Sequence, residues 1–337
     1  MLKFVLKRLG VMLLTAFALT FIVFWLTNLP PNLEKLAKSE AGTRISDAEV
    51  GTWLSENGYT STTLNRYGQW LGVLPGWTFT ATDGTVRGRC IVKGQDAAEA
   101  SSYCGLLQGD WGMSTVFKPN TVLAVLGRSL ALTGWLMLAV MLVMVPTSLF
   151  LGVLSGMREG SRTDRVLSTF SIASTATPEY VSGVIFIALL ASPTIGLSPL
   201  LSGAGWIESR TLFMGTSTSA MDDITFWNFA LPVMTIALYG IGYIARMTRA
   251  SMTEVMTAQY IRTARLKGVS FGQVVMRHAL RNALIAPFTV IMLQFPWLLN
   301  GVVIVETLFN YKGFGWTLVQ AAGNNDIELL LGCSVVA

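Results

Sequence analysis

Six long apolar stretches constrain this chain more than any other feature of its sequence. The first, residues 9–29, carries no charge over 21 residues, which is about 31 Å of helix and matches the hydrocarbon core of a bilayer. Only 13% of all residues are charged, whereas a soluble domain has about 25%, so a soluble fold would lack the residues to cover its core. The sequence predicts an all-α integral membrane protein with about six transmembrane helices. The other stretches are 129–157, the run from 166 to about 193–199, 224–245, 282–305 and 327–337.

The first stretch has an alternative interpretation as a cleaved signal peptide, because Lys3, Lys7 and Arg8 precede it. Its apolar run is longer than the usual length of about 7–15 residues, and Pro30 and Pro31 stand where a small-residue cleavage site belongs. We therefore expect a retained helix.

The positions of the basic residues predict the orientation. They concentrate at the N-terminus, at 158–165 and at 246–281, and positively charged loops stay in the cytoplasm. We therefore expect a cytoplasmic N-terminus and external segments at 30–120, 193–223 and 306–326. The predicted parts are 1–30, with the first helix, 31–120, a small external domain, and 121–337, a membrane core with the remaining helices.

Three cysteines bear on the compartment. Cys90 and Cys104 both lie in the predicted external domain, where oxidation is the default. We expect them to form a disulfide; the alternative is two free thiols. Cys333 lies in the last apolar stretch and is interpreted as a small buried hydrophobic residue.

Motifs for catalysis are missing from the sequence. There is no phosphate-binding G-x-x-x-x-G-K-[S/T] loop and no G-x-S-x-G elbow. His278 is the only histidine and has no Cys-x-x-Cys near it, so no ordinary zinc site is expected. We therefore expect no catalytic, cofactor-binding or metal-binding residue in this chain, and no enzymatic activity of its own.

Glu179 is the one acid well inside an apolar stretch, and such residues are functional candidates by default. Thr177 and Pro178 precede it, which also fits a helix start with an N-cap, an N1 proline and a first-turn acid. Both interpretations stay open: a structural helix start, or a side chain that lines a substrate pathway.

The cytoplasmic segment 246–284 has the pattern helix, glycine, helix. Met256, Tyr260 and Ala264 recur every four residues, and Gly268 can adopt the left-handed conformation that ends a helix. Ser270 and Gln273 fit a capping box for the next helix. A short helix of this kind suits docking into a groove of a soluble partner. The alternative is a plain basic loop.

The residues of this segment resemble a known family. Tyr-Ile-Arg-Thr-Ala-Arg-Leu-Lys-Gly at 260–268 and Arg-His-Ala-Leu-Arg-Asn-Ala-Leu-Ile at 277–285 are similar to the cytoplasmic signature of dipeptide/oligopeptide-type ABC importer permeases. Three further segments resemble the same family. Together with the cytoplasmic signature they extend the resemblance over nearly the whole chain. They are Leu-Leu-Gln-Gly-Asp-Trp-Gly at 106–112, Arg-Thr-Asp-Arg at 162–165, and Val-Glu-Thr-Leu-Phe-Asn-Tyr-Lys-Gly-Phe-Gly at 305–315.

The resemblance implies a type I permease fold in the bacterial inner membrane. It implies pairing with a homologous second permease, two cytoplasmic ATPases that bind ATP and Mg, and an external solute-binding protein. Peptides are the expected substrate; nickel complexes, opines and oligosaccharides are alternatives. The implied ATPase-coupling residues are Met256, Tyr260 and Ala264 on a groove-facing side, Arg262, Arg265 and Lys267 at its rim, and Thr263 and Gly268.

The segment 306–326 carries Glu306, Phe309 and Phe314 next to the end of the fifth stretch. We expect these residues to pack at an external gate and meet the binding protein or the second permease. The alternative is a simple aromatic belt at the membrane interface.

Two departures from the family pattern stand out. Residues 73–104 resemble an insertion, and 327–337 is about half the length that a bilayer needs, so we expect that last span to continue. Two other functions remain open. A self-sufficient secondary transporter would want internal repeats and intramembrane carboxylates, and a membrane-anchored interaction protein would need only one span.

Overall fold

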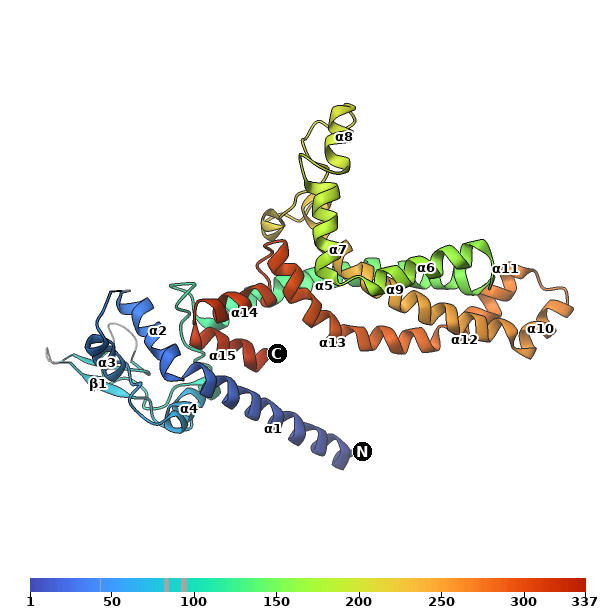
Figure 1. Ribbon diagram of the computed structural model, residues 1–337. Coiled ribbons are helices and arrows are strands. Elements are labelled where there is room, and N and C mark those ends of the chain that lie inside the picture. The colour runs from blue at the N-terminus through green and yellow to red at the C-terminus, as the bar shows by residue number, and fades with distance from the viewer. Residues whose placement is uncertain (43, 82–84, 92–95) are drawn as a thin grey trace. The chain divides into compact units, whose positions relative to one another are not determined.

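The computed structural model describes residues 1–42, 44–81, 85–91 and 96–337 (Figure 1). Part of the predicted insertion 73–104 therefore lies outside the described residues. The chain divides into two compact units, Met1–Arg128 with Thr317–Ala337, and Ser129–Trp316. Helices α5 and α14 contribute residues to both. The described residues are mostly helical, so the all-α prediction is confirmed.

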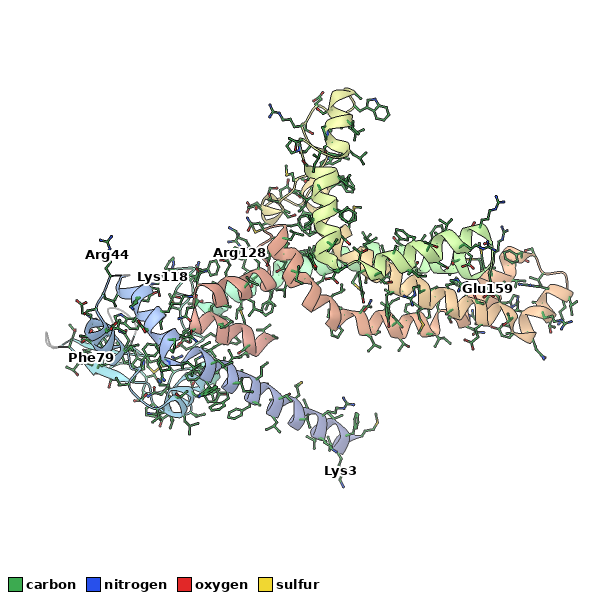
Figure 2. All side chains as sticks on the ribbon, viewed as in Figure 1. Lys3, Arg44, Phe79, Lys118, Arg128 and Glu159 are labelled. Carbon is green, nitrogen blue, oxygen red and sulfur yellow. A yellow bond between two sulfur atoms is a disulfide. The ribbon has the colours of Figure 1, made fainter. Side chains whose placement is uncertain are left out.

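The first unit contains α1, a group of short helices and one two-stranded antiparallel sheet. Helix α1 is apolar after Lys3, Lys7 and Arg8, and few of its residues are buried by the rest of the first unit; Lys3 marks its start in Figure 2. The elements of this unit are α1 (Leu2–Thr27), α2 (Pro30–Ala41), α3 (Asp47–Glu56), α4 (Thr63–Leu71), β1 (Thr78–Thr80), β2 (Val86–Gly88), η1 (Leu106–Gln108), the start of α5 (Val122–Gly156), the end of α14 (Phe314–Gly323) and α15 (Ile327–Val336).

Aromatic side chains fill the core of the first unit. The Tyr67 ring meets Phe21 and Phe24 of α1 edge-on, with centroids 5.2 and 5.3 Å away. Its hydroxyl lies 2.9 Å from the Thr20 hydroxyl, so the polar end of the ring has a partner where it is buried. Tyr67 also stacks on Trp70 at 5.8 Å. These contacts fix the short helix α4 against α1.

The second unit is built around α9, which is apolar and mostly buried by its neighbours. Leu231, Ile236 and Ile244 of α9 are fully buried and belong to one core with Leu136 and Leu298. The elements of this unit are the rest of α5, α6 (Arg162–Ala176), α7 (Glu179–Phe186), η2 (Ile187–Ala191), α8 (Leu197–Gly203), η3 (Thr218–Met221), α9 (Phe226–Thr257), α10 (Gln259–Leu266), α11 (Phe271–Gln273), η4 (Val274–Ala279), α12 (Leu280–Ala283), α13 (Ile285–Leu308) and the start of α14.

Three helices of the described residues, α1, α5 and α9, are long and apolar enough to cross a membrane, and counting each bent pair as one span raises the number to five. The predicted third span is not one straight helix, because α6 and the segment from α7 to η2 meet at 105°. The fifth bends by 49° before α13. The sixth is the short helix α15.

The bend between α6 and α7 corrects the predicted helix start. The Thr177 hydroxyl donates back to the Ala173 carbonyl at 2.9 Å, so it closes α6 and does not cap α7. Pro178 is the N-cap residue of α7 and provides no side-chain bond. Glu179 does lie in the first turn of α7, as expected.

Candidate coupling site and its surroundings

The predicted coupling helix 256–268 is two separate helices. α9 ends at Thr257, and Ala258 is extended with φ −64° and ψ 148°. The chain then starts α10, which covers Gln259–Leu266. Met256 therefore belongs to the end of α9, and the prediction that it shares one helical face with Tyr260 and Ala264 is wrong.

The inner face of α10 packs inside the chain. Ile261 is fully buried and Ala264 is 8% exposed. They join a small aliphatic cluster whose other members come from α9 and from the segment after Gly268; this coupling core consists of Met252, Ile261, Ala264, Val274, Val275, Ala279 and Ala283. Since Ala264 is buried against its own chain, the expectation that it enters a partner's groove is wrong.

The outer face of α10 is exposed. Leu266 is 80% exposed, and Arg262 and Thr263, which lie on the same side one turn earlier, are also exposed. Arg265 and Lys267 are exposed beside them. Leu266 is exposed, whereas Ile261 and Ala264 of the same helix are buried. The sequence spacing alone did not reveal this difference.

Tyr260 connects α10 to the next helix. Its side chain is 43% exposed, and its hydroxyl accepts a hydrogen bond of 2.9 Å from Asn282 Nδ2 in α12. The ring is therefore available to a partner, while its polar end holds the segment together.

Gly268 ends α10 in the predicted left-handed conformation, with φ 79°. The Val269 N–H donates to the Ala264 carbonyl at 3.2 Å and the Gly268 N–H donates to the Arg265 carbonyl at 3.0 Å, which is the paired pattern of a glycine-ended helix. Space is free around Gly268, so only the backbone conformation requires glycine there.

The predicted capping box of Ser270 and Gln273 is wrong, because Ser270 makes no side-chain bond to the helix that follows it. That helix opens with α11, continues as the π-turn η4 and ends in α12. The Phe271 ring at its start lies under two guanidinium groups, Arg158 at 5.6 Å and Arg265 at 6.0 Å.

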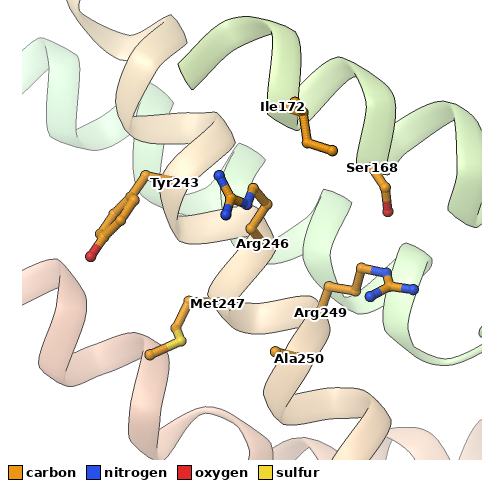
Figure 3. Close-up of a pocket in the computed structure, with 7 residues that line it drawn as sticks. All are labelled: Ser168, Ile172, Tyr243, Arg246, Met247, Arg249 and Ala250. Carbon is orange, nitrogen blue, oxygen red and sulfur yellow. The ribbon is translucent and has the colours of Figure 1, made fainter. Parts of the chain in front are cut away.

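An ion pair next to this segment was not foreseen. Asp164 of α6 is 3% exposed and accepts from both Nε and Nη2 of Arg249 of α9, at 2.5 and 2.8 Å. The two residues are 85 positions apart, so no local pattern signals the pair. A shallow pocket of about 380 Å³ lies beside it and is lined by Ser168, Ile172, Tyr243, Arg246, Met247, Arg249 and Ala250 (Figure 3).

The predicted external-gate residues are mostly internal. Phe309 and Glu306 are fully buried, and Glu306 accepts hydrogen bonds from the Thr133 hydroxyl and, at 3.0 Å, from the Trp316 N–H. Phe314 is partly buried, and its N–H donates to Thr133 Oγ1 at 2.7 Å. Phe309 is thus a core residue, which excludes it from an exposed aromatic belt.

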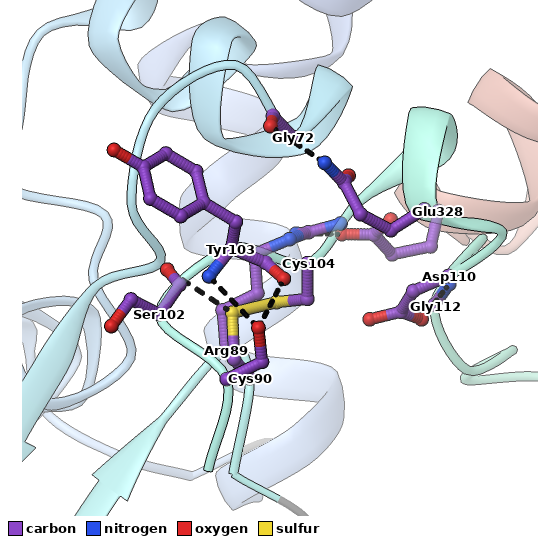
Figure 4. Close-up of a disulfide and its surroundings, with 11 residues drawn as sticks. Gly72, Arg89, Cys90, Ser102, Tyr103, Cys104, Asp110, Gly112 and Glu328 are labelled. Atoms are coloured by element: carbon purple, nitrogen blue, oxygen red, sulfur yellow. Dashed lines mark hydrogen bonds and ion pairs between the residues drawn. A yellow bond between two sulfur atoms is a disulfide. The ribbon is translucent and has the colours of Figure 1, made fainter.

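The predicted disulfide is confirmed: Cys90 and Cys104 are bonded, with their Cα atoms 5.5 Å apart (Figure 4). Beside it, Arg89 pairs with Glu328 at 3.1 Å. Burial alone would lower the pKa of Arg89, but the Glu328 carboxylate outweighs it and the pKa is raised. Among the described residues, no three His, Cys, Asp or Glu side chains gather as a metal site would require.

Comparison with known proteins decides the family. Residues 148–337 match the model of the binding-protein-dependent transport system inner membrane component. This chain belongs to that family. The match includes the complete coupling segment and the Asp164–Arg249 pair, so the geometry described above lies in the family's own region.

Several curated relatives are similar to this permease. A probable peptide ABC transporter permease protein of Sinorhizobium fredii is 35% identical over 227 residues, 67% of either chain. A di/tripeptide transport system permease protein of Pseudomonas aeruginosa is 36% identical over 203 residues, 58% of this chain and 60% of the relative. A glutathione transport system permease protein of Escherichia coli is 30% identical over 224 residues, 66% of either chain. The chain is thus a multi-pass membrane permease component of a binding-protein-dependent transport system.

Proposed function

We propose that this permease takes peptides from an external solute-binding protein and carries them inward, using ATP that two cytoplasmic ATPases hydrolyse. A homologous second permease would complete the path, and the N-terminus would lie in the cytoplasm. The relatives support a peptide substrate, since one is named as a probable peptide permease, one as a di/tripeptide permease and one as a glutathione permease. Nickel complexes, opines and oligosaccharides remain the alternative solutes.

The observation that carries the coupling role is the contrast between the two faces of α10. Its inner face is closed by the coupling core, whereas Leu266 on its outer face is 80% exposed and contributes nothing to that core. A large aliphatic side chain on a short, well-anchored helix is suited to insertion into a partner's groove.

We therefore assign the ATPase contact to the outer face of α10, with Leu266 as its apolar anchor. Arg262, Thr263 and Lys267 would surround it. Tyr260 and Gly268 would fix the orientation of α10, through the hydrogen bond to Asn282 and the left-handed helix end. Met256 and Ala264 would support α10 by packing in or against the coupling core. Arg265 would act mainly by holding the Phe271 ring.

The test is a comparison of Leu266→Ala with Leu107→Ala, since Leu107 is a leucine of the first unit that is 69% exposed. Burying an anchor in a partner typically contributes about 2 kcal/mol or more, so Leu266→Ala should weaken ATPase association roughly 30-fold while Leu107→Ala has no effect. The measurement is titration of purified ATPase onto the two permeases reconstituted in nanodiscs. Equal association of both variants would reject the assigned contact.

Co-purification in mild detergent followed by mass spectrometry tests the larger assembly. The importer requires two ATPases and a second permease in the preparation. A homo-oligomer alone, with ion-dependent uptake, would instead establish a secondary transporter. Uptake competition among a dipeptide, glutathione and a nickel chelate then separates the solute classes.

Two further positions belong to the proposal. Glu179, which is partly buried in the first turn of α7, would line the pathway, and Glu179→Gln should then change uptake without changing ATPase association. Glu306 stabilises the turn between α13 and α14. This turn, together with Phe314, would contact the second permease or the binding protein. Phe314→Ser tests this contact without disturbing the buried Phe309.

A further inference from the structure

We propose that Asp164 is a positioning residue for coupling, which clamps the turn between α5 and α6 to α9 so that this turn moves with the coupling segment as one body. The inference rests on the proposed ATPase contact at α10 and extends it, because it names the second part of the chain that receives the movement.

The first support is the geometry of the pair. Asp164 accepts two hydrogen bonds from the Arg249 guanidinium, at 2.5 and 2.8 Å. A two-point contact of this kind fixes orientation as well as distance. Arg249 lies on α9 close to the point where that helix ends and α10 begins.

The second support is the way in which the turn itself surrounds the carboxylate. Asp164 also accepts from the Ser155 hydroxyl at 2.5 Å, the Gly160 N–H at 2.8 Å and the Ser168 hydroxyl at 3.2 Å. These donors come from the end of α5, the turn and the start of α6. One side chain thus ties three consecutive segments to Arg249.

The third support is the close contact of the backbones of α5 and α9. A Cβ atom on Gly152 would lie 2.7 Å from the Ala245 carbonyl oxygen, and one on Gly156 would lie 2.7 Å from the Arg249 carbonyl oxygen. Gly152 and Gly156 form a G-x-x-x-G pair, the spacing that lets membrane helices touch. Relative sliding of these two helices is therefore sterically restricted.

A fourth contact links the same turn to Phe271, at the start of α11 in the coupling segment. Arg158 lies over the Phe271 ring at 5.6 Å, and Arg265 of α10 reaches the same ring at 6.0 Å. The turn is thus attached to α9 on one side and to the start of α11 on the other. A push on α10 would reach α5 and α6 as well as α9 and α13.

The experiment compares Asp164→Asn and Arg249→Gln with Arg165→Gln, an exposed arginine next to Asp164, in complete transporters reconstituted in liposomes. Peptide uptake and ATP hydrolysis are measured on the same preparation, below the unfolding temperature of every variant. We expect the two clamp variants to transport about three- to tenfold less peptide per ATP hydrolysed, as substitutions along a coupling route can do. Arg165→Gln should keep the wild-type ratio.

A second variant separates positioning from folding. Asp164→Cys with Arg249→Cys removes both charges, and a short bifunctional thiol reagent then joins the two sites. Cross-linking should restore the transport per ATP, whereas reagent on either single cysteine variant should not. A lowered unfolding temperature with an unchanged ratio would reduce Asp164 to a merely structural role and overturn the inference.

Failure of the clamp and failure of the proposed contact give different results. If Leu266→Ala loses ATPase association but Asp164→Asn keeps the wild-type ratio, the contact stands and the clamp is rejected. If Leu266→Ala also behaves as wild type, the contact itself is rejected.

Discussion

The predicted external domain, 31–120, and the coupling segment, 246–284, are stabilised in different ways. The predicted external domain uses large aromatic side chains such as Tyr67 and Trp70, together with a disulfide and the Arg89–Glu328 pair. The coupling segment has no disulfide among the described residues, and the Arg249–Asp164 ion pair joins only its start, in α9, to α6. It relies on small aliphatic side chains, one glycine-ended helix and one hydrogen bond between Tyr260 and Asn282.

This difference reflects what each region has available. A segment of short helices has little apolar surface to bury, so cross-links stabilise it. The coupling segment packs small residues closely and thereby leaves one face of α10 uncovered. The disulfide thus distinguishes the region that is cross-linked within itself, and the uncovered face of α10 distinguishes the region to which we assign a partner.

The largest expected effect tests the ionic part of this comparison. Arg89→Met leaves Glu328 without its partner, and removing one partner of a mostly buried ion pair typically costs about 3–5 kcal/mol. Arg87→Met, which replaces an exposed arginine of β2 two residues before Arg89, should be neutral. The measurement is the urea concentration at which the predicted external domain becomes sensitive to protease. If both variants have the same midpoint, the ion pair does not stabilise this region.

The disulfide gives the next largest effect. Its half-cystines are 14 positions apart, and closing a loop of this length contributes about 3 kcal/mol in the chain-entropy model. Replacing both Cys90 and Cys104 by Ser should lower the same midpoint. Reductant should lower the midpoint of the wild type by the same amount and leave the midpoint of the variant unchanged. A wild type that resists reductant and still labels with a thiol reagent would contradict the expectation.

Gly268→Ala tests the coupling segment. An alanine at φ 79° costs about 1–2 kcal/mol, so α10 should fray at its end and show faster hydrogen exchange at the amides of 264–269. Gly272→Ala is the matched control, since Gly272 lies in a helix without positive φ and has free space around it. Equal exchange in the two variants would show that the left-handed cap is dispensable.

The smallest effect is expected at Tyr260. Tyr260→Phe removes the hydroxyl that accepts from Asn282, a loss of about 0.5–1.5 kcal/mol at most. A double-mutant cycle with Asn282→Ala, read by thermal unfolding, isolates this bond. Additive effects of the two substitutions would mean that the bond does not hold α10 to α12.

The sequence predicted the features that local patterns encode. The apolar runs predicted the all-α membrane class, and Gly268 predicted the end of a helix. The predicted external position of Cys90 and Cys104 indicated their disulfide. The interruption between α9 and α10 at Ala258 has no proline or glycine to mark it. For this reason the sequence predicted one helix that contained both Met256 and Tyr260. The π-turn after Gln273 likewise replaced the expected capped helix.

Long-range placement explains the other differences. Phe309 follows an apolar run and looks like an interfacial aromatic, but it is buried in a core with Phe229, Leu136 and other residues far away in the chain. Asp164 and Arg249 carry no common motif. The G-x-x-x-G spacing at Gly152 and Gly156 was present in the sequence and could have indicated the contact between α5 and a neighbouring helix.

The uncovered face of α10 has a consequence for how such transporters diversify. Arg262, Thr263 and Leu266 take no part in the coupling core, so substitutions there leave the fold of the permease untouched. With the ATPase contact proposed above, recognition of a particular ATPase would change by a few surface replacements, while Ile261 and Ala264 beneath them stay as they are. A cell with several importers of this type would then keep their motors separate by varying this one strip of surface.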